Sequence, residues 1–177
     1  MKKISFVLAI GIISIIPVRA QDTQMEANVT KVERLQTLIP VKVPLPADNK
    51  NLINIKAIRD FSKTFKTVTN EDWYVIQNGF MVKFKNQDIQ HRVIYNRRGN
   101  RVATFRYYNE GQLCSEVRNL IKSIWYDAAI THITEVNFGG KTAYLVNTQD
   151  KTSIKTIKVV NNEMEICQEI ITTAQNP

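Results

Sequence analysis

The feature of this sequence that most constrains its fold is an order of elements that occurs twice. A helix-like stretch at 52–65 is followed by four strand-like runs, and a second helix-like stretch at 113–124 is followed by four more. The spacing of about 60 residues is long for the unit of an open solenoid array. The pattern therefore predicts one duplicated domain, with copies at 51–109 and 110–172.

Both helices are predicted from apolar residues that return every three or four positions, which gives a helix one apolar stripe. The stripe of the first helix contains Leu52, Ile55, Ile58, Phe61 and Phe65. The stripe of the second contains Leu113, Val117, Leu120, Ile121 and Ile124. Asp48 or Asn49 is a suitable N-cap for the first helix, and Asn109 for the second.

The strands are predicted from alternating apolar and polar residues and from the turn residues between the runs. The runs are 73–77, 80–85, 92–95 and 102–108, then 132–138, 142–148, 154–160 and 164–171. Asn78-Gly79 is the strongest turn signal, because both central positions of such a hairpin favour positive φ. Short hairpin loops make neighbouring strands antiparallel. The expected fold class is α+β: a tandem duplication of a helix followed by a four-stranded antiparallel meander, with the helices packed on one face of the sheet.

The N-terminus has the three-part pattern of a secretory signal: a basic start at 2–3, an apolar run at 4–16, and residues at 18–20 that signal peptidase can read. The apolar run is too short to span a bilayer permanently. We expect residues 1–20 to be a signal peptide cleaved after Ala20, which makes the mature protein periplasmic or secreted; an uncleaved membrane anchor is the alternative. No cysteine lies near this site, which argues against a lipoprotein anchor.

Residues 21–50 are expected to form a proline-containing lead-in, and residues 173–177 a C-terminal tail. Pro40, Pro44 and Pro46 favour extended backbone in the lead-in. The lead-in is therefore either a flexible tether or an edge strand that lies along the domain.

The charge of the chain does not indicate a nucleic-acid-binding protein. The formal net charge is +8, and the signal peptide supplies three of these charges, which leaves +5. The remaining lysines and arginines are spread over both copies, whereas nucleic-acid modules usually cluster them on one helix or stripe. A solvated, soluble surface explains the surplus.

The two cysteines, Cys114 and Cys167, both lie in the second copy. An exported setting permits a disulfide between them, and two buried thiols without a bridge are the alternative. Neither cysteine has the spacing of a metal site or of a redox pair.

The sequence offers little that could carry catalysis. It contains two histidines, His91 near Asp88 and His132, and a solvent-facing strand position is the simplest interpretation of His91. Neither a nucleophile-elbow serine nor a zinc or calcium ligand pattern is present, and Gly139-Gly140 indicates a hairpin turn rather than a phosphate loop. We therefore expect a protein that is not an enzyme and has no metal or cofactor.

One hairpin of the first copy combines arginines with aromatic residues, which are enriched at protein interfaces. Alternation directs Phe105 and Tyr107 to one face of the sheet and Arg106 and Tyr108 to the other, so half of the aromatic residues belong to the core. The candidate binding residues are Arg92, Arg97, Arg98, Arg101, Arg106 and Tyr108.

Several stretches of the first copy carry a resemblance to known proteins. They are the amphipathic helix ending near Phe65, Trp73 at the start of a strand, Gly79-Phe80-Met81-Val82-Lys83-Phe84, and Val93-Ile94-Tyr95-Asn96 leading through Gly99 to Val102. With the signal peptide, this helix-plus-four-strand unit resembles the PepSY-like family of bacterial exported proteins. Its tandem form, over residues 51–172, resembles the β-lactamase-inhibitor-like fold.

The resemblance implies an exported, non-enzymatic binding protein for a protein, a peptide or an acidic envelope component. Because inhibition of peptidases or β-lactamases is proposed or shown for some relatives, an inhibitor or regulator of a peptidase-type envelope hydrolase is the alternative. The β-lactamase inhibitor itself has a disulfide in each repeat and dedicated inhibitory loops. This chain has no cysteine in its first copy and short hairpin loops, so β-lactamase inhibition is not expected.

Overall fold

The computed structural model describes residues 47–68 and 70–172 of the 177-residue chain. The predicted signal peptide, nearly all of the predicted lead-in and the C-terminal tail therefore lie outside the described residues.

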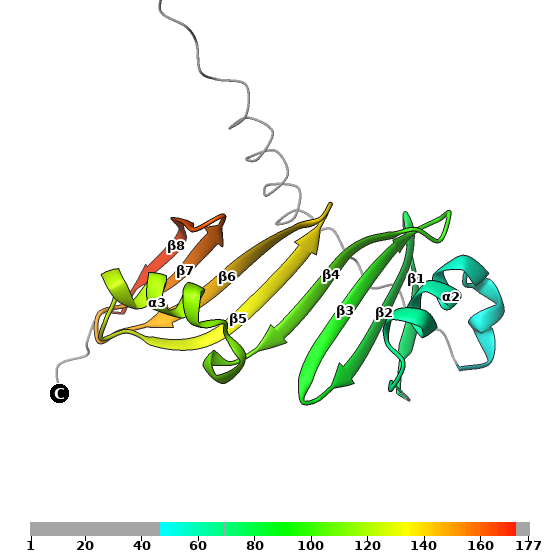
Figure 1. Cartoon of the computed structure of the whole chain (residues 1–177), viewed down its shortest axis with the longest axis horizontal. Coiled ribbons are helices and arrows are strands. Elements are labelled where there is room, and N and C mark those ends of the chain that lie inside the picture. Colours follow the sequence, from blue (N-terminus) through cyan, green and yellow to red (C-terminus); the bar gives the residue numbers. More distant parts are fainter. Residues whose placement is uncertain (1–46, 69, 173–177) are drawn as a thin grey trace, which may run out of the picture.

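The described chain forms one continuous antiparallel sheet, in which each strand pairs with its neighbours in the sequence (Figure 1). Its eight strands are β1 (Asp72–Ile76), β2 (Gly79–Asn86), β3 (Ile89–Asn96), β4 (Arg101–Tyr108), β5 (Ala129–Phe138), β6 (Lys141–Gln149), β7 (Ser153–Val160) and β8 (Glu163–Ile171). The α-helices of this region are α2 (Ile55–Thr64) and α3 (Ser115–Ile124), and the short 3-10 helices η1 (Ala47–Leu52) and η2 (Glu110–Gln112) precede them.

The predicted fold class, two four-stranded meanders each with its own helix, is wrong. Strand β4 pairs with β5 over six residue pairs, from Ala103 opposite Phe138 to Tyr108 opposite Ile133. The last strand of the first predicted copy and the first strand of the second are thus hydrogen-bonded neighbours in a single eight-stranded sheet. Alternation along a strand predicts which face each side chain occupies, but it carries no information on pairing across the segment that contains α3.

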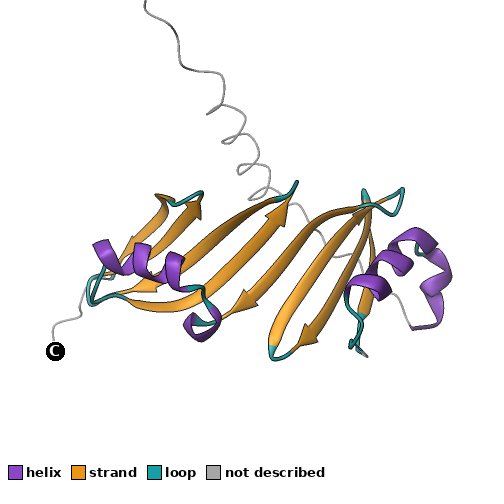
Figure 2. Ribbon diagram, viewed as in Figure 1, coloured by secondary structure: helices purple, strands orange, loops and turns teal. Residues whose placement is uncertain are grey.

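Both helices pack against the same face of this sheet, which we call the helix-bearing face (Figures 1 and 2). Phe61 of α2 is buried against a cluster that includes Phe84, and Ile121 of α3 is buried in a cluster with Val159. One cross-strand row joins the two clusters, because Phe84, His91, Arg106, Glu135, Tyr144 and Val159 are successive partners across β2 to β7.

Each α-helix begins later than the sequence predicts, because a 3-10 helix precedes it. The predicted caps at 48–49 lie inside η1, and the side chain of Asn54 caps α2 by accepting a hydrogen bond from the amide of Lys56 at 2.9 Å. Asn109 precedes η2, and Cys114 occupies the N-cap position of α3 without a side-chain hydrogen bond.

The first hairpin turns one residue earlier than predicted. Ile76 pairs with Gly79, so the turn consists of Gln77 and Asn78, and Gly79 is the first residue of β2. A Cβ atom at Gly79 would lie 2.0 Å from the carbonyl oxygen of Tyr95. Glycine is therefore required here by the close approach of β3 and by a backbone φ of +151°, although residue 79 lies outside the two-residue turn.

The opposite face of the sheet, which we call the helix-free face, has its own apolar cluster. Its buried residues are Tyr74, Met81, Ile94, Ala103, Phe105 and Val136, from β1 to β5. Within residues 47–68 and 70–172, both α-helices lie on the other face. Strands β1 to β5 are thus apolar on both faces, as strands buried on both sides are.

Candidate ligand-binding face

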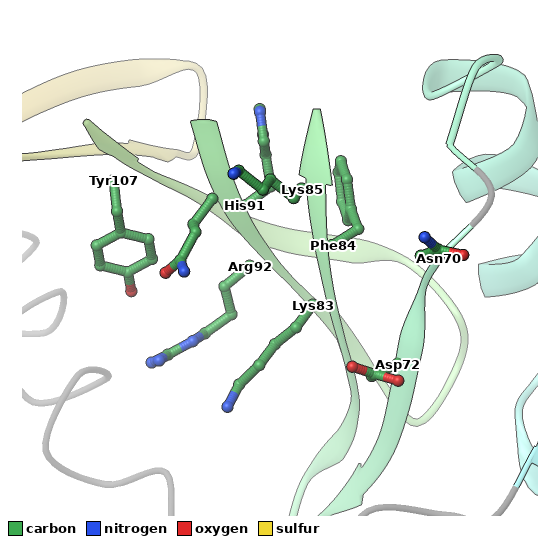
Figure 3. Close-up of a pocket in the computed structure, with 9 residues that line it drawn as sticks. Asn70, Asp72, Lys83, Phe84, Lys85, His91, Arg92 and Tyr107 are labelled. Atoms are coloured by element: carbon green, nitrogen blue, oxygen red, sulfur yellow. The ribbon is translucent and has the colours of Figure 1, made fainter. Parts of the chain in front are cut away.

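A pocket of about 400 Å³ lies beside the apolar cluster of the helix-free face, over β1 to β4 (Figure 3). The polar side chains that line it include Asp72, Lys83, Lys85, Gln90, Arg92 and Tyr107. Asp72, Lys83 and Arg92 are successive cross-strand partners on β1, β2 and β3, and Arg92 faces Phe105 on its other side. These residues therefore share the helix-free face.

Lys83 and Arg92 are like charges placed directly opposite each other, an arrangement that destabilises a sheet. Figure 3 shows that both side chains extend to the same side of the strands. In the described part of the chain, neither of them forms an ion pair. The neighbouring Lys85 does, because its Nζ lies 2.8 Å from Oδ1 of Asp88.

Aromatic rings support both unpaired cations. Nζ of Lys83 lies 5.0 Å from the ring centre of Tyr74, and Cζ of Arg92 lies 5.5 Å from that of Tyr107. These are cation–π distances. The Nε atom of Arg92 is buried without a hydrogen-bond partner among the described residues, so a donor is left unsatisfied. Burial raises the pKa of Tyr107, although Arg92 opposes the shift, so the hydroxyl stays protonated at neutral pH and can donate.

The two histidines contact aromatic rings. His91 is half-buried and stacks on Phe84 with the ring centres 4.8 Å apart, so its expected solvent-facing position is wrong. Burial lowers the pKa of His91, the charge of Arg106 lowers it further, and Glu135 opposes both. His132 stacks on Tyr107 at 6.3 Å.

The six candidate binding residues from the sequence lie in three places. Arg92 lines the pocket on the helix-free face. Arg97 and Arg98 lie in the turn between β3 and β4, Arg101 is the first residue of β4, and Arg106 and Tyr108 lie on the helix-bearing face. The structure therefore does not bring the six together on one surface.

The turn between β3 and β4 holds α2 against the sheet. Nη2 of Arg97 donates to the carbonyl oxygen of Gln77 at 2.7 Å, and Nε of Arg101 lies 3.3 Å from Oδ2 of Asp60 on α2. The same Asp60 oxygen accepts a hydrogen bond from the Tyr95 hydroxyl at 3.0 Å. Burial, followed by this hydrogen bond, raises the pKa of Tyr95. Arg98 is exposed.

Glu135 of β5 joins β4 to β5 on the helix-bearing face. Nη1 of Arg106 donates to both of its carboxylate oxygens, at 3.1 and 2.9 Å, and the Tyr108 hydroxyl donates to Oε2 at 2.7 Å. Burial and then Glu135 raise the pKa of Tyr108. A second pocket, of about 500 Å³, lies beside this pair and extends to Phe65 at the end of α2.

Sequence reasoning missed Lys83, Tyr74 and Tyr107 as parts of a candidate site. Alternation along the run 80–85 puts Lys83 on the face opposite Phe80, Val82 and Phe84, and this is the signal that the sequence offers. Alternation does not give the register between β2 and β3, and it is this register that places Lys83 opposite Arg92.

Within the described ranges, no three His, Cys, Asp or Glu side chains gather as metal ligands would, and neither helix is long and apolar enough to cross a membrane. Cys114 is half-buried and Cys167 is exposed, and the two do not form a disulfide. The Cys114 thiol donates to the Tyr144 hydroxyl at 4.0 Å. Burial, followed by Cys114, raises the pKa of Tyr144 to about 12.

Comparison with known proteins finds similar folds but no family. No protein-family model matches the chain, and no curated protein matches it. A BLIP-like protein from Bacteroides fragilis matches with a TM-score of 0.54 and 12% identity, over 75% of this chain and 91% of that one. A DUF2874 family protein from Bacteroides ovatus has a TM-score of 0.54 and 14% identity, over 67% and 87% of the two chains.

A third solved structure, a candidate periplasmic protein from Bacteroides eggerthii, has a TM-score of 0.53 and 12% identity, over 67% of this chain and 88% of that one. Identities this low carry information on fold alone. The PepSY-like family is not shown by these matches. They do show that the chain has a BLIP-like fold, in agreement with the β-lactamase-inhibitor-like resemblance of the sequence.

Proposed function

We propose that this protein is an exported, non-enzymatic binding protein that holds a protein, a peptide or an acidic envelope component on the helix-free face of its sheet. The observation that carries the proposal is the pair Lys83 and Arg92, which lie opposite each other and form no ion pair within the described chain. An acidic partner would relieve their repulsion and provide a counter-charge for the Arg92 guanidinium.

The surroundings of the histidines support a non-enzymatic role. His91 and His132 both stack on aromatic rings. A catalytic base needs the substrate or a nucleophile within hydrogen-bond reach. The fold match to a candidate periplasmic protein supports export.

The test is capture of partners from envelope extract by the chain without residues 1–20, followed by binding measurements with each purified partner. In a Lys83→Gln/Arg92→Gln variant, we expect the affinity for a true partner to fall at least about tenfold, as for the loss of a charge-assisted contact. Arg98→Gln, at an exposed turn position outside the pocket, is the matched control. If the double variant binds every purified partner as tightly as the parent, the helix-free face is not the binding surface.

The second candidate function is regulation of an envelope hydrolase of the peptidase type. The observation that favours it is the fold match over 91% of a BLIP-like protein. An excess of the purified protein should then slow at least one purified envelope peptidase, measured by hydrolysis of a fluorogenic peptide. Equal rates with and without the protein, across the whole panel, would refute this function.

A further inference from the structure

The pocket on the helix-free face is lined by more cationic side chains than carboxylates. Lys83 and Arg92 supply an ammonium and a guanidinium group, and the protonated Tyr107 supplies a hydroxyl. Figure 3 shows these three groups on the same side of the strands. Asp72 is the one carboxylate among the lining side chains. Such a set is suited to an oxyanion, since each oxygen accepts hydrogen bonds from charged donors.

The charge of the site indicates a monoanion. Asp72 lies opposite Lys83, and Lys85 is already paired with Asp88 outside the lining set. The row of Asp72, Lys83 and Arg92 therefore has a formal charge of +1, with its negative end at β1 and its positive end at β3. A carboxylate matches this charge, whereas Asp72 would repel the second charge of a phosphate dianion.

Arg92 is the residue that most requires such a ligand. Its cross-strand neighbours are a cation, Lys83, and an apolar ring, Phe105. Its Nε–H is buried and lacks an acceptor among the described residues, and its guanidinium lies over the Tyr107 ring. A guanidinium that lies over a ring and has no ion-pair partner among the described residues is suited to bind a carboxylate.

We propose that Lys83 and Arg92 form a carboxylate-binding subsite, with one carboxylate oxygen on the Arg92 guanidinium and the other on the Lys83 ammonium. This inference deepens the proposed function and rests on it: the carboxylate is an Asp or Glu side chain of the bound polypeptide. The subsite gives the helix-free face a preference for acidic segments over neutral ones.

The test uses the chain without residues 1–20 and two probes. In the first arm, the ¹⁵N–H resonance of Arg92 Nε is followed during titration with sodium acetate, with sodium phosphate and with sodium chloride at matched ionic strength. Acetate should give a saturable shift that weakens about tenfold in Lys83→Gln. A response that is absent with acetate, unchanged in Lys83→Gln, or tighter with phosphate would overturn the carboxylate assignment.

In the second arm, fluorescence anisotropy measures binding of labelled hexaglutamate and hexaglutamine. Hexaglutamate should bind more tightly, and Arg92→Gln should remove most of the difference, whereas Arg98→Gln should leave it intact. Both Lys83→Gln and Arg92→Gln remove a like-charge contact, so we expect their urea midpoints to equal or exceed that of the parent. A lowered midpoint together with an unchanged peptide preference would contradict the subsite.

The outcomes also separate the subsite from the proposed function. Acetate and hexaglutamate binding without any envelope partner would leave the subsite standing and refute the proposed function. A partner held on the helix-free face with no response of the Arg92 resonance would support the proposed function and refute the subsite.

Discussion

At the scale of the residue, two independent constraints require a glycine at position 99. Its φ is +74°, in the left-handed region, and a Cβ atom there would lie 2.8 Å from Oδ1 of Asn54 and 2.9 Å from the amide nitrogen of Ala57. The stretch from Tyr95 to Val102, which is part of the sequence resemblance, therefore leaves room for the start of α2. Its role in the fold is to let this helix pack closely on the sheet.

Gly99→Ala should lower the free energy of unfolding by about 2–3 kcal/mol, because backbone strain and a steric clash combine. Gly139→Ala is the matched control, since its φ is +58° but no atom lies within 4 Å of its Cβ position. The control should cost about 1–2 kcal/mol, from the left-handed backbone alone. Urea denaturation followed by far-UV circular dichroism measures both, and equal costs would show that the contact with α2 is unimportant.

Asp150 is the residue whose charge state links stability to pH. The backbone amide and the hydroxyl of Thr152, and then the hydroxyl of Ser153, hold the pKa of its carboxyl far below the usual range. A carboxyl whose pKa is lower in the folded than in the unfolded chain contributes stability above its unfolded pKa of about 3.9, and that contribution is lost as the pH falls through the folded pKa.

Urea midpoints measured from pH 6 to pH 2 should therefore fall more steeply in the parent than in Asp150→Asn. Parallel profiles for the parent and Asp150→Asn would contradict the assignment.

Single-residue orientations were partly accessible from the sequence. Alternation correctly separates Phe105 and Tyr107 from Arg106 and Tyr108, since these residues lie on one strand. It misjudged His91, because the rings around that histidine come from α2 and β2 and only the fold brings them there.

At the scale of the element, Glu135 is the clearest link between strands. Glu135→Gln should lower the free energy of unfolding by about 1–2 kcal/mol, because the Arg106 and Tyr108 donors lose a charged acceptor while solvent still screens the half-exposed Arg106. Asp88→Asn removes the exposed partner of Lys85 and should leave the urea midpoint unchanged. Equal effects of the two substitutions would show that the Glu135 contacts contribute nothing specific.

The elements themselves were predictable, and their ends less so. All eight strands and both helices occur where periodicity places them, because side-chain patterning is a local property. The helix starts were misplaced because η1 and η2 use the polar residues expected to be caps, and Asn54 and Cys114 stand there instead.

At the scale of the whole molecule, β4 pairs with β5, so we expect the described chain to unfold as one cooperative unit. Trp73 lies in the cluster under α2 and Trp125 packs on the cluster under α3, and they are the chain's two tryptophans. Urea unfolding of Trp73→Phe and Trp125→Phe should each show coincident fluorescence and circular dichroism transitions. Two resolved transitions in either variant would indicate that the halves unfold independently.

Neither the continuity of the sheet nor the Lys83–Arg92 pair could be predicted from the sequence, and the reason is the same for both. Both depend on register between strands, and register is decided by the summed packing of both faces rather than by any local signal. Lys83 and Arg92 are nine residues apart, and no local feature of the sequence indicates that they will lie opposite each other.

Each of the strands β1 to β8 pairs only with the strand just before it and the strand just after it in the sequence. Contacts between sequence neighbours close short loops, which favours rapid folding. In the export that we propose, a chain that emerges N-terminus first can therefore build its sheet strand by strand, each new strand docking on an edge that is already complete. The order of emergence and the order of assembly are then the same, and the growing sheet has no more open edges than the finished one.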